Sequence, residues 1–177
     1  MTKPLQLIVF SFGALVLFGG CQENTPEFSA GVMNLMTKYN NQGRHDDAIR
    51  IAQDWLKKHP DEHEMRAIFD EQIAISFLMK AGKDAAPKDE WIAQAVAYYD
   101  DYVSVCRKYD DVNLAPQNAG WGLEMAGDLS GNNRCLYYGR ALELFAEPYG
   151  KTIPLKPQQK EDALKRVKAK FDRTGCK

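Results

Sequence analysis

The chain has 177 residues with 23 basic and 24 acidic side chains, and its formal net charge is −1. This balance argues against a nucleic-acid partner, which would require a clustered basic surface. The length suits a single domain that can bury a core of its own, and the scarcity of β-branched runs favours helices.

The first residues have the organisation of a secretory signal peptide. Lys3 and the amino terminus supply positive charge, and an uncharged apolar run of 14 residues follows from position 5 to 18. A membrane-spanning helix needs about 20 apolar residues, so this run is too short to serve as one. Residues 22–27 are polar and turn-prone, and they show no stop-transfer pattern.

A cysteine closes this segment after two glycines. Residues 18–21 (Phe-Gly-Gly-Cys) resemble the bacterial lipobox, in which the cysteine thiol receives diacylglycerol and the cysteine becomes the new N-terminus. Phe18 stands where leucine is more usual. The resemblance implies cleavage before Cys21 and lipidation of that residue. The alternative is an ordinary signal peptide followed by a coincidental cysteine.

The lipobox resemblance also implies a domain organisation and a location. Residues 1–20 are expected to be the signal peptide, 21–28 the lipidated N-terminus and tether, and 29–177 the folded domain. Gln22 next to the cysteine is typical of sorting to the outer membrane. We therefore expect a lipid-anchored protein of the bacterial cell envelope, on the outer membrane and facing the periplasm.

The folded domain opens with two helices. From Ser29, apolar residues recur at spacings of three and four up to the polar break at residues 40–43. A second helix is expected to begin at Asp46 or Asp47 and to end at the His-Pro pair at 59–60. Together these elements predict an antiparallel helical hairpin.

Eight residues of this hairpin fall at or close to signature positions of the tetratricopeptide (TPR) repeat, a 34-residue pair of helices. They are Val32, Leu35, Tyr39, Gly43, Ala48, Ala52, Trp55 and Pro60. The segment therefore resembles a TPR unit, although any amphipathic hairpin remains the alternative. Small residues such as Ala48 and Ala52 suit positions where two helices cross closely.

Two further helix pairs and a last helix follow from the same periodicity, with Ile68 and Leu136 among the residues expected to face inward. The expected helices cover residues 65–80, about 90–106, about 117–130, 133–146 and 158–173, with a loop over 81–88. We therefore expect an all-α fold, and the TPR resemblance implies a stack of about three antiparallel helix pairs plus a C-terminal capping helix. The register of the later pairs against the repeat stays open.

Three cysteines remain beyond Cys21, so one pair and one single thiol are expected. Consecutive helices of the stack alternate in direction, which puts Cys106 and Cys135 at opposite edges. A helix of about 14 residues spans roughly 21 Å, and a disulfide reaches only about 7 Å between Cα atoms. Because the last helix returns to the edge where Cys135 lies, we predict a Cys135–Cys176 disulfide and a buried Cys106 thiol.

We find no pattern that indicates an enzyme, a cofactor or a metal site. His59 and His63 have a spacing that suits a metal on a helix, but Pro60 lies between them, so these residues and His45 are interpreted as solvated loop residues. Residues 119–122 (Ala-Gly-Trp-Gly) lack the preceding strand of a phosphate-binding loop. Close packing against a neighbouring helix explains these glycines better.

The TPR resemblance implies that the protein binds rather than reacts. In that family the first helix of each pair lines a groove for peptides or partner helices, and Met33, Thr37, Asn40 and Asn41 are expected to face it. Amides can hold a peptide backbone, and methionine adapts to apolar side chains.

The leading hypothesis is a non-enzymatic adaptor for an envelope protein or peptide, of the assembly or secretion type. The alternative is a lipoprotein that inhibits, or confers immunity to, an envelope-acting enzyme or toxin.

Overall fold

The computed structural model describes residues 29–83, 88–109, 115–147 and 157–176, and the described residues form helices without strands. The expected signal peptide, Cys21 and the tether lie outside the described residues. Among the helices that are described, none is both long and apolar enough to cross a membrane. The helices are α1 (Ser29–Asn41), α2 (His45–Lys58), α3 (His63–Lys83), α4 (Lys88–Tyr109), α5 (Ala115–Leu129), α6 (Arg134–Ala146) and α7 (Pro157–Arg173).

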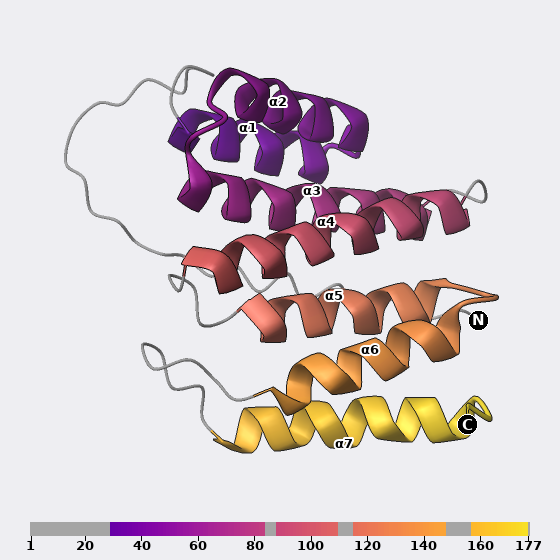
Figure 1. The fold of residues 1–177 in the computed structure, drawn as a ribbon. Coiled ribbons are helices and arrows are strands. Elements are labelled where there is room, and N and C mark those ends of the chain that lie inside the picture. The colour runs from indigo at the N-terminus through magenta and orange to yellow at the C-terminus, as the bar shows by residue number, and fades with distance from the viewer. Residues whose placement is uncertain (1–28, 84–87, 110–114, 148–156, 177) are drawn as a thin grey trace.

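The helices stack in chain order, as Figure 1 shows from α1 and α2 to α7. Each helix packs on the next, so that α1–α2, α3–α4 and α5–α6 form antiparallel hairpins and α7 covers the end. The prediction of an all-α fold is therefore confirmed.

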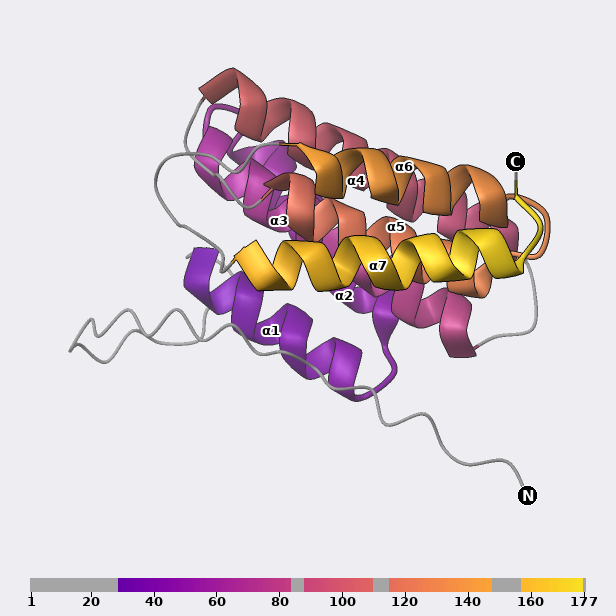
Figure 2. The same cartoon turned by 90° about the horizontal axis from the view of Figure 1, so that it is seen from below.

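The two sides of the stack differ. On one side α1 packs on α3 and α3 packs on α5, whereas α2, α4 and α6 make no comparable contact with one another within the described residues. Long side chains bridge those even-numbered helices instead, as where the Gln53 amide donates to the Tyr98 hydroxyl (2.7 Å) and Arg140 pairs with Asp100. We call the side formed by α1, α3 and α5 the odd-helix face, and it is the more closely packed side. Figure 2 views the stack from its α7 end.

The helix boundaries follow the sequence periodicity with one exception. The predicted loop over 81–88 is wrong in part, because α3 continues to Lys83 and α4 begins at Lys88. Ala81 is fully buried, so its packing extends the helix beyond the predicted end. Two residues that were expected to face inward are exposed instead: Ile68 at 38 % and Leu136 at 57 %.

Among the glycines of the described residues, those of α5 lie closest to side chains of neighbouring helices. A Cβ added at Gly122 would lie 2.1 Å from the Tyr99 ring of α4, and one added at Gly127 would lie 2.4 Å from the Tyr138 ring of α6. At Gly120 the corresponding distance to Phe145 is 3.0 Å. The glycines of residues 119–122 therefore serve tight helix packing, as the sequence predicted.

Two further connections hold α7 in place. Cys135 and Cys176 form a disulfide with Cα atoms 5.4 Å apart, as predicted, while Cys106 is buried outside this bridge. Both carboxylate oxygens of Glu124 in α5 accept hydrogen bonds from one edge of the Arg166 guanidinium, from Nε at 2.8 Å and from Nη2 at 2.6 Å. Lys170 of α7 also lies 2.8 Å from the Glu124 carboxylate.

The close approach at Gly122 predicts opposite effects for two glycine-to-alanine changes. Gly122→Ala is expected to lower the free energy of unfolding by about 1–3 kcal/mol, because the methyl group overlaps the Tyr99 ring. Gly139→Ala is the matched control: its Cβ would lie 3.7 Å from Phe171, an ordinary contact, so it should raise stability by up to about 1 kcal/mol through helix propensity. Urea unfolding measures both. Equal effects of the two changes would contradict the packing at Gly122.

Removing the disulfide should destabilise the capping end of the stack. The bridge closes a loop of 41 residues, and the chain-entropy model gives an upper value of about 4 kcal/mol for a loop of this size. We expect the double variant Cys135→Ser, Cys176→Ser to lower the free energy of unfolding by about 2–4 kcal/mol. Equal urea midpoints for the double variant and for the oxidised parent would contradict this assignment.

Candidate binding face

Three of the four residues expected to face a groove lie at the surface, and the fourth is buried. Thr37 and Asn41 of α1 are exposed and Met33 is half-buried. Asn40 is only 7 % exposed, so the expectation that it faces a groove is wrong. Its amide nitrogen donates to the Ser76 hydroxyl of α3 (2.9 Å), and its amide oxygen lies 3.0 Å from Nδ1 of His45.

His45 also differs from the sequence interpretation. It is the first residue of α2 and is 4 % exposed, so it is a buried residue rather than a solvated one. Through Asn40 it is joined to Ser76, and this buried polar group connects α1, α2 and α3. A polar side chain that holds three helices together in this way is not available to clamp a peptide.

The exposed surface of α3 carries a row of mainly apolar side chains. Ile68, Gln72, Ile75 and Met79 are partly exposed and follow one another at spacings of four, three and four, which place them on one line along a helix. Phe77, on the opposite side of α3, stacks on Tyr98 of α4 with ring centroids 5.9 Å apart. The row therefore points away from α4.

Helices α1 and α5 flank this row. Ser76 of α3 bonds to Asn40 of α1, which fixes α1 along one side. On the other side, a Cβ at Gly82 would lie 3.9 Å from the Leu129 side chain of α5. Because α1, α3 and α5 run in the same direction, these two contacts imply that Met33 lies towards the Ile68 end of the row and Met125 towards the Met79 end. Met125 is 38 % exposed.

The resulting odd-helix face is mainly uncharged, with the partly exposed Glu71 at the border between the row and α5. Its partly or fully exposed side chains are Met33, Thr37, Asn41, Ile68, Gln72, Ile75, Met79, Trp121 and Met125. Exposed charges in line with the row stand at its two ends on α3: Glu64, one turn before Ile68, and Lys83, one turn after Met79. In a chain with 27 % charged residues, so long a neutral row distinguishes this face.

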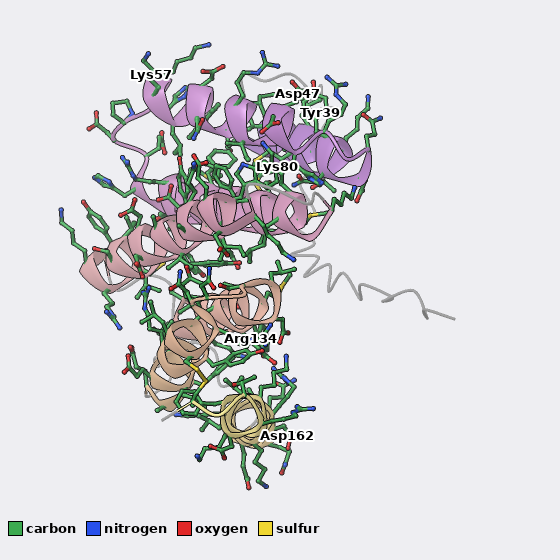
Figure 3. All side chains as sticks on the ribbon, turned by 90° about the vertical axis from the view of Figure 1, so that its right-hand side faces the viewer. Tyr39, Asp47, Lys57, Lys80, Arg134 and Asp162 are labelled. Atoms are coloured by element: carbon green, nitrogen blue, oxygen red, sulfur yellow. A yellow bond between two sulfur atoms is a disulfide. The ribbon has the colours of Figure 1, made fainter. Side chains whose placement is uncertain are left out.

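The even-numbered helices present the opposite character. A surface cavity of about 400 Å³ between α4 and α6 is lined largely by charged residues, and Arg107 pairs with Glu147 across it. A smaller cavity of about 250 Å³ lies at the α1–α2 end, where Figure 3 shows Tyr39 and Asp47 close together. The hydrogen bond from Arg44 holds the pKa of Asp47 below its usual value, so this carboxylate is ionised and already paired.

Two acids went unrecognised in the sequence, Asp70, which is buried, and Glu71, which is partly buried. Asp70 is 2 % exposed, and its Oδ2 has no hydrogen-bond partner among the described residues, with Arg66 Nε 3.9 Å away. Burial raises the pKa of Asp70 to about 7. Burial likewise raises the pKa of Glu71 to about 7, against a hydrogen bond from Asn118. The only sequence signal was a pair of acids inside an apolar helical run.

These acids do not form a metal site with their neighbours. Within the described ranges, no group of three His, Cys, Asp or Glu residues could hold a metal ion. Burial also raises the pKa values of Tyr99 and Tyr102 of α4, and the charge of Glu71 adds to both shifts. The cluster is therefore a packed polar interior between α3, α4 and α5 rather than an open site.

Comparison with protein-family models, with curated proteins and with solved structures gives no match to this chain. The odd-helix face and the sequence are therefore the features that indicate a function.

The buried acids predict that stability falls as pH rises. Because the folded-state pKa values of Asp70 and Glu71 are about 7, above their ordinary values of 3.8 and 4.5, the native chain binds more protons than the unfolded chain between these values. This stabilising contribution is complete below about pH 4 and is lost as pH rises through 7. The free energy of unfolding in urea should therefore be lower at pH 8 than at pH 5 by at least about 1 kcal/mol, the equivalent of one pKa unit.

Two variants separate this effect from other titrations. Asp70→Asn with Glu71→Gln should reduce the difference between pH 5 and pH 8, whereas Asp54→Asn, at an exposed site of α2, should leave it unchanged. Burial alone would raise the pKa of Glu124, but the hydrogen bonds from Arg166 and Lys170 outweigh it and lower that pKa. Glu124 therefore titrates below pH 5 and does not contribute to the stability difference between pH 5 and pH 8. If the free energy of unfolding of the double variant falls between pH 5 and pH 8 as much as that of the parent, the assignment is contradicted.

Proposed function

We propose that this protein is a lipid-anchored, non-enzymatic adaptor of the bacterial cell envelope that binds another envelope protein on its odd-helix face. The observation that carries the proposal is the neutral row of Ile68, Gln72, Ile75 and Met79 between α1 and α5. Partly exposed apolar side chains grouped on one face of a soluble domain typically mark an interaction site.

The N-terminal sequence supports the membrane anchor. A lipid on Cys21 would leave only residues 21–28 before α1 begins at Ser29. Eight extended residues reach at most roughly 26–29 Å. The odd-helix face, which begins with α1, would therefore stay within reach of other proteins at the same membrane.

The arrangement of the helices supports a TPR-like reading. Three hairpins stack with their first helices in mutual contact and their second helices apart, and the first hairpin carries residues that resemble the repeat signature. In repeat proteins of this kind, a curved stack presents an extended binding surface. The exposed methionines add adaptability to that surface.

A charge placed on the odd-helix face should abolish partner capture. Ile68→Lys with Met125→Lys puts two cations on the face at sites that are each 38 % exposed, so the fold should tolerate both. A photocrosslinking amino acid at Thr37, in the full-length lipoprotein in intact cells, reports capture. We expect the yield of the crosslinked product to fall at least about tenfold, the equivalent of 1.4 kcal/mol.

Leu136→Lys is the matched control, because Leu136 is an exposed apolar residue of α6 outside the odd-helix face. It should leave the crosslink yield unchanged. If Leu136→Lys abolishes capture and the double variant does not, the binding face is wrongly assigned. A one-to-one complex with an envelope hydrolase or toxin would instead favour the inhibitor or immunity function.

A further inference from the structure

We infer that the odd-helix face binds an amphipathic α-helix of the partner, seated along α3 between α1 and α5, and not an extended peptide. The inference rests on the proposed function and specifies the partner's conformation and charge. It follows from the hydrogen-bonding groups of the face, from its dimensions and from the charges at its ends.

Hydrogen bonding decides between a helix and an extended segment. An extended peptide must satisfy its backbone N–H and C=O groups wherever binding removes water from them. Asn40, which was expected to provide such bonds, is buried and already bonded to Ser76 and close to His45. The polar side chains that this face exposes, Thr37, Asn41 and Gln72, are too few to satisfy the backbone of an extended segment as long as the row. A helix forms its backbone hydrogen bonds internally, so none of them is lost when it binds to this apolar surface.

The dimensions of the face agree with a helix. Packed helices have axes about 8–10 Å apart, and a helix with its side chains is about 10–12 Å wide. A partner helix therefore fits over α3, with α1 and α5 on its flanks. From Ile68 to Met79 the row extends about 16 Å, which accommodates three turns and anchors at positions i, i+3 or i+4, and i+7.

Methionines surround the position along α3 that this helix would occupy. Met33, Met79 and Met125 come from three different helices, and each is at least partly exposed. Unbranched thioether side chains adjust to the shape of apolar residues on a partner helix. The contacting side of that helix is mainly apolar, because a charge brought onto the row would be removed from water, and Glu71 at the border with α5 is the carboxylate beside it.

Charges at the two ends specify the partner further. Glu64 is exposed in the first turn of α3, and Lys83 is exposed at its last residue. The two positions are about 28 Å apart along the helix. A complementary partner helix carries a basic side chain at the Glu64 end and an acidic side chain at the Lys83 end.

Crosslink spacing tests the helix directly. A photocrosslinking amino acid is placed at Ile68 in one full-length protein and at Met79 in another, and the trapped partner residues are mapped by mass spectrometry from intact cells. Because the two sites are about 16 Å apart, a helical partner gives trapped positions about 11 residues apart. An extended partner gives positions about 5 residues apart, and that spacing would overturn the inference while leaving the adaptor function standing.

Other outcomes are equally decisive. Trapped peptides from this same chain would identify a second copy as the occupant and overturn the inference. If neither site traps a protein while a probe at Ser104 on α4 does, both the inference and the proposed binding face fail. The spacing of the crosslinks therefore separates the failure of one from the failure of the other.

A charge exchange tests the polarity of the partner. Glu64→Lys with Lys83→Glu should lower the yield of the Met79 crosslink about threefold or more, since two exposed ion pairs become repulsive. The matched control is Glu90→Lys with Lys108→Glu, which exchanges exposed charges in the first and last turns of α4 and should leave the yield unchanged. Equal yields in both double variants would overturn the charge assignment.

Discussion

The contact on which the rest of the structure depends is the approach of α5 to both α4 and α6 at glycines. Gly122 lies under the Tyr99 ring and Gly127 lies under the Tyr138 ring, and any larger side chain at either position would force the helices apart. These contacts place α5 in the middle of the C-terminal half of the stack. The position of α5 then decides which of its residues reach α3, which reach α7 and which stay exposed.

Three consequences follow from this placement. On one side Asn118 reaches Glu71 of α3, so that acids, amides and tyrosines can share a packed interior. On the side of α7, Glu124 receives Arg166 and Lys170, which together with the disulfide fasten the capping helix. On the remaining side Met125 extends the neutral row of α3. The rigidity of the stack and the binding face that we propose thus have a common origin.

Much of the fold could be predicted from the sequence because helical periodicity and turn residues act locally. The Cys135–Cys176 pairing was also predictable, since alternating helix directions place only those two cysteines at one edge. The orientation of individual residues was less accessible. Asn40 and His45 can be buried because their side chains form a hydrogen bond with each other, and the Asn40 amide also donates to Ser76, which only the packing of α3 brings close. Ile68 is apolar and was assigned to the core, yet the stack leaves it exposed and thereby creates the candidate face.

The most direct test of the central claim, that a partner covers the odd-helix face in the cell, is hydroxyl-radical footprinting of the purified protein and of the protein in intact cells. Met36 is 1 % exposed and serves as a protected reference in both samples, and Leu136, outside the face, serves as an exposed one. The account predicts that Met33, Met79 and Met125 are oxidised in the purified protein and protected in cells, while Leu136 is modified in both. Equal oxidation of these three methionines in the two samples would contradict it.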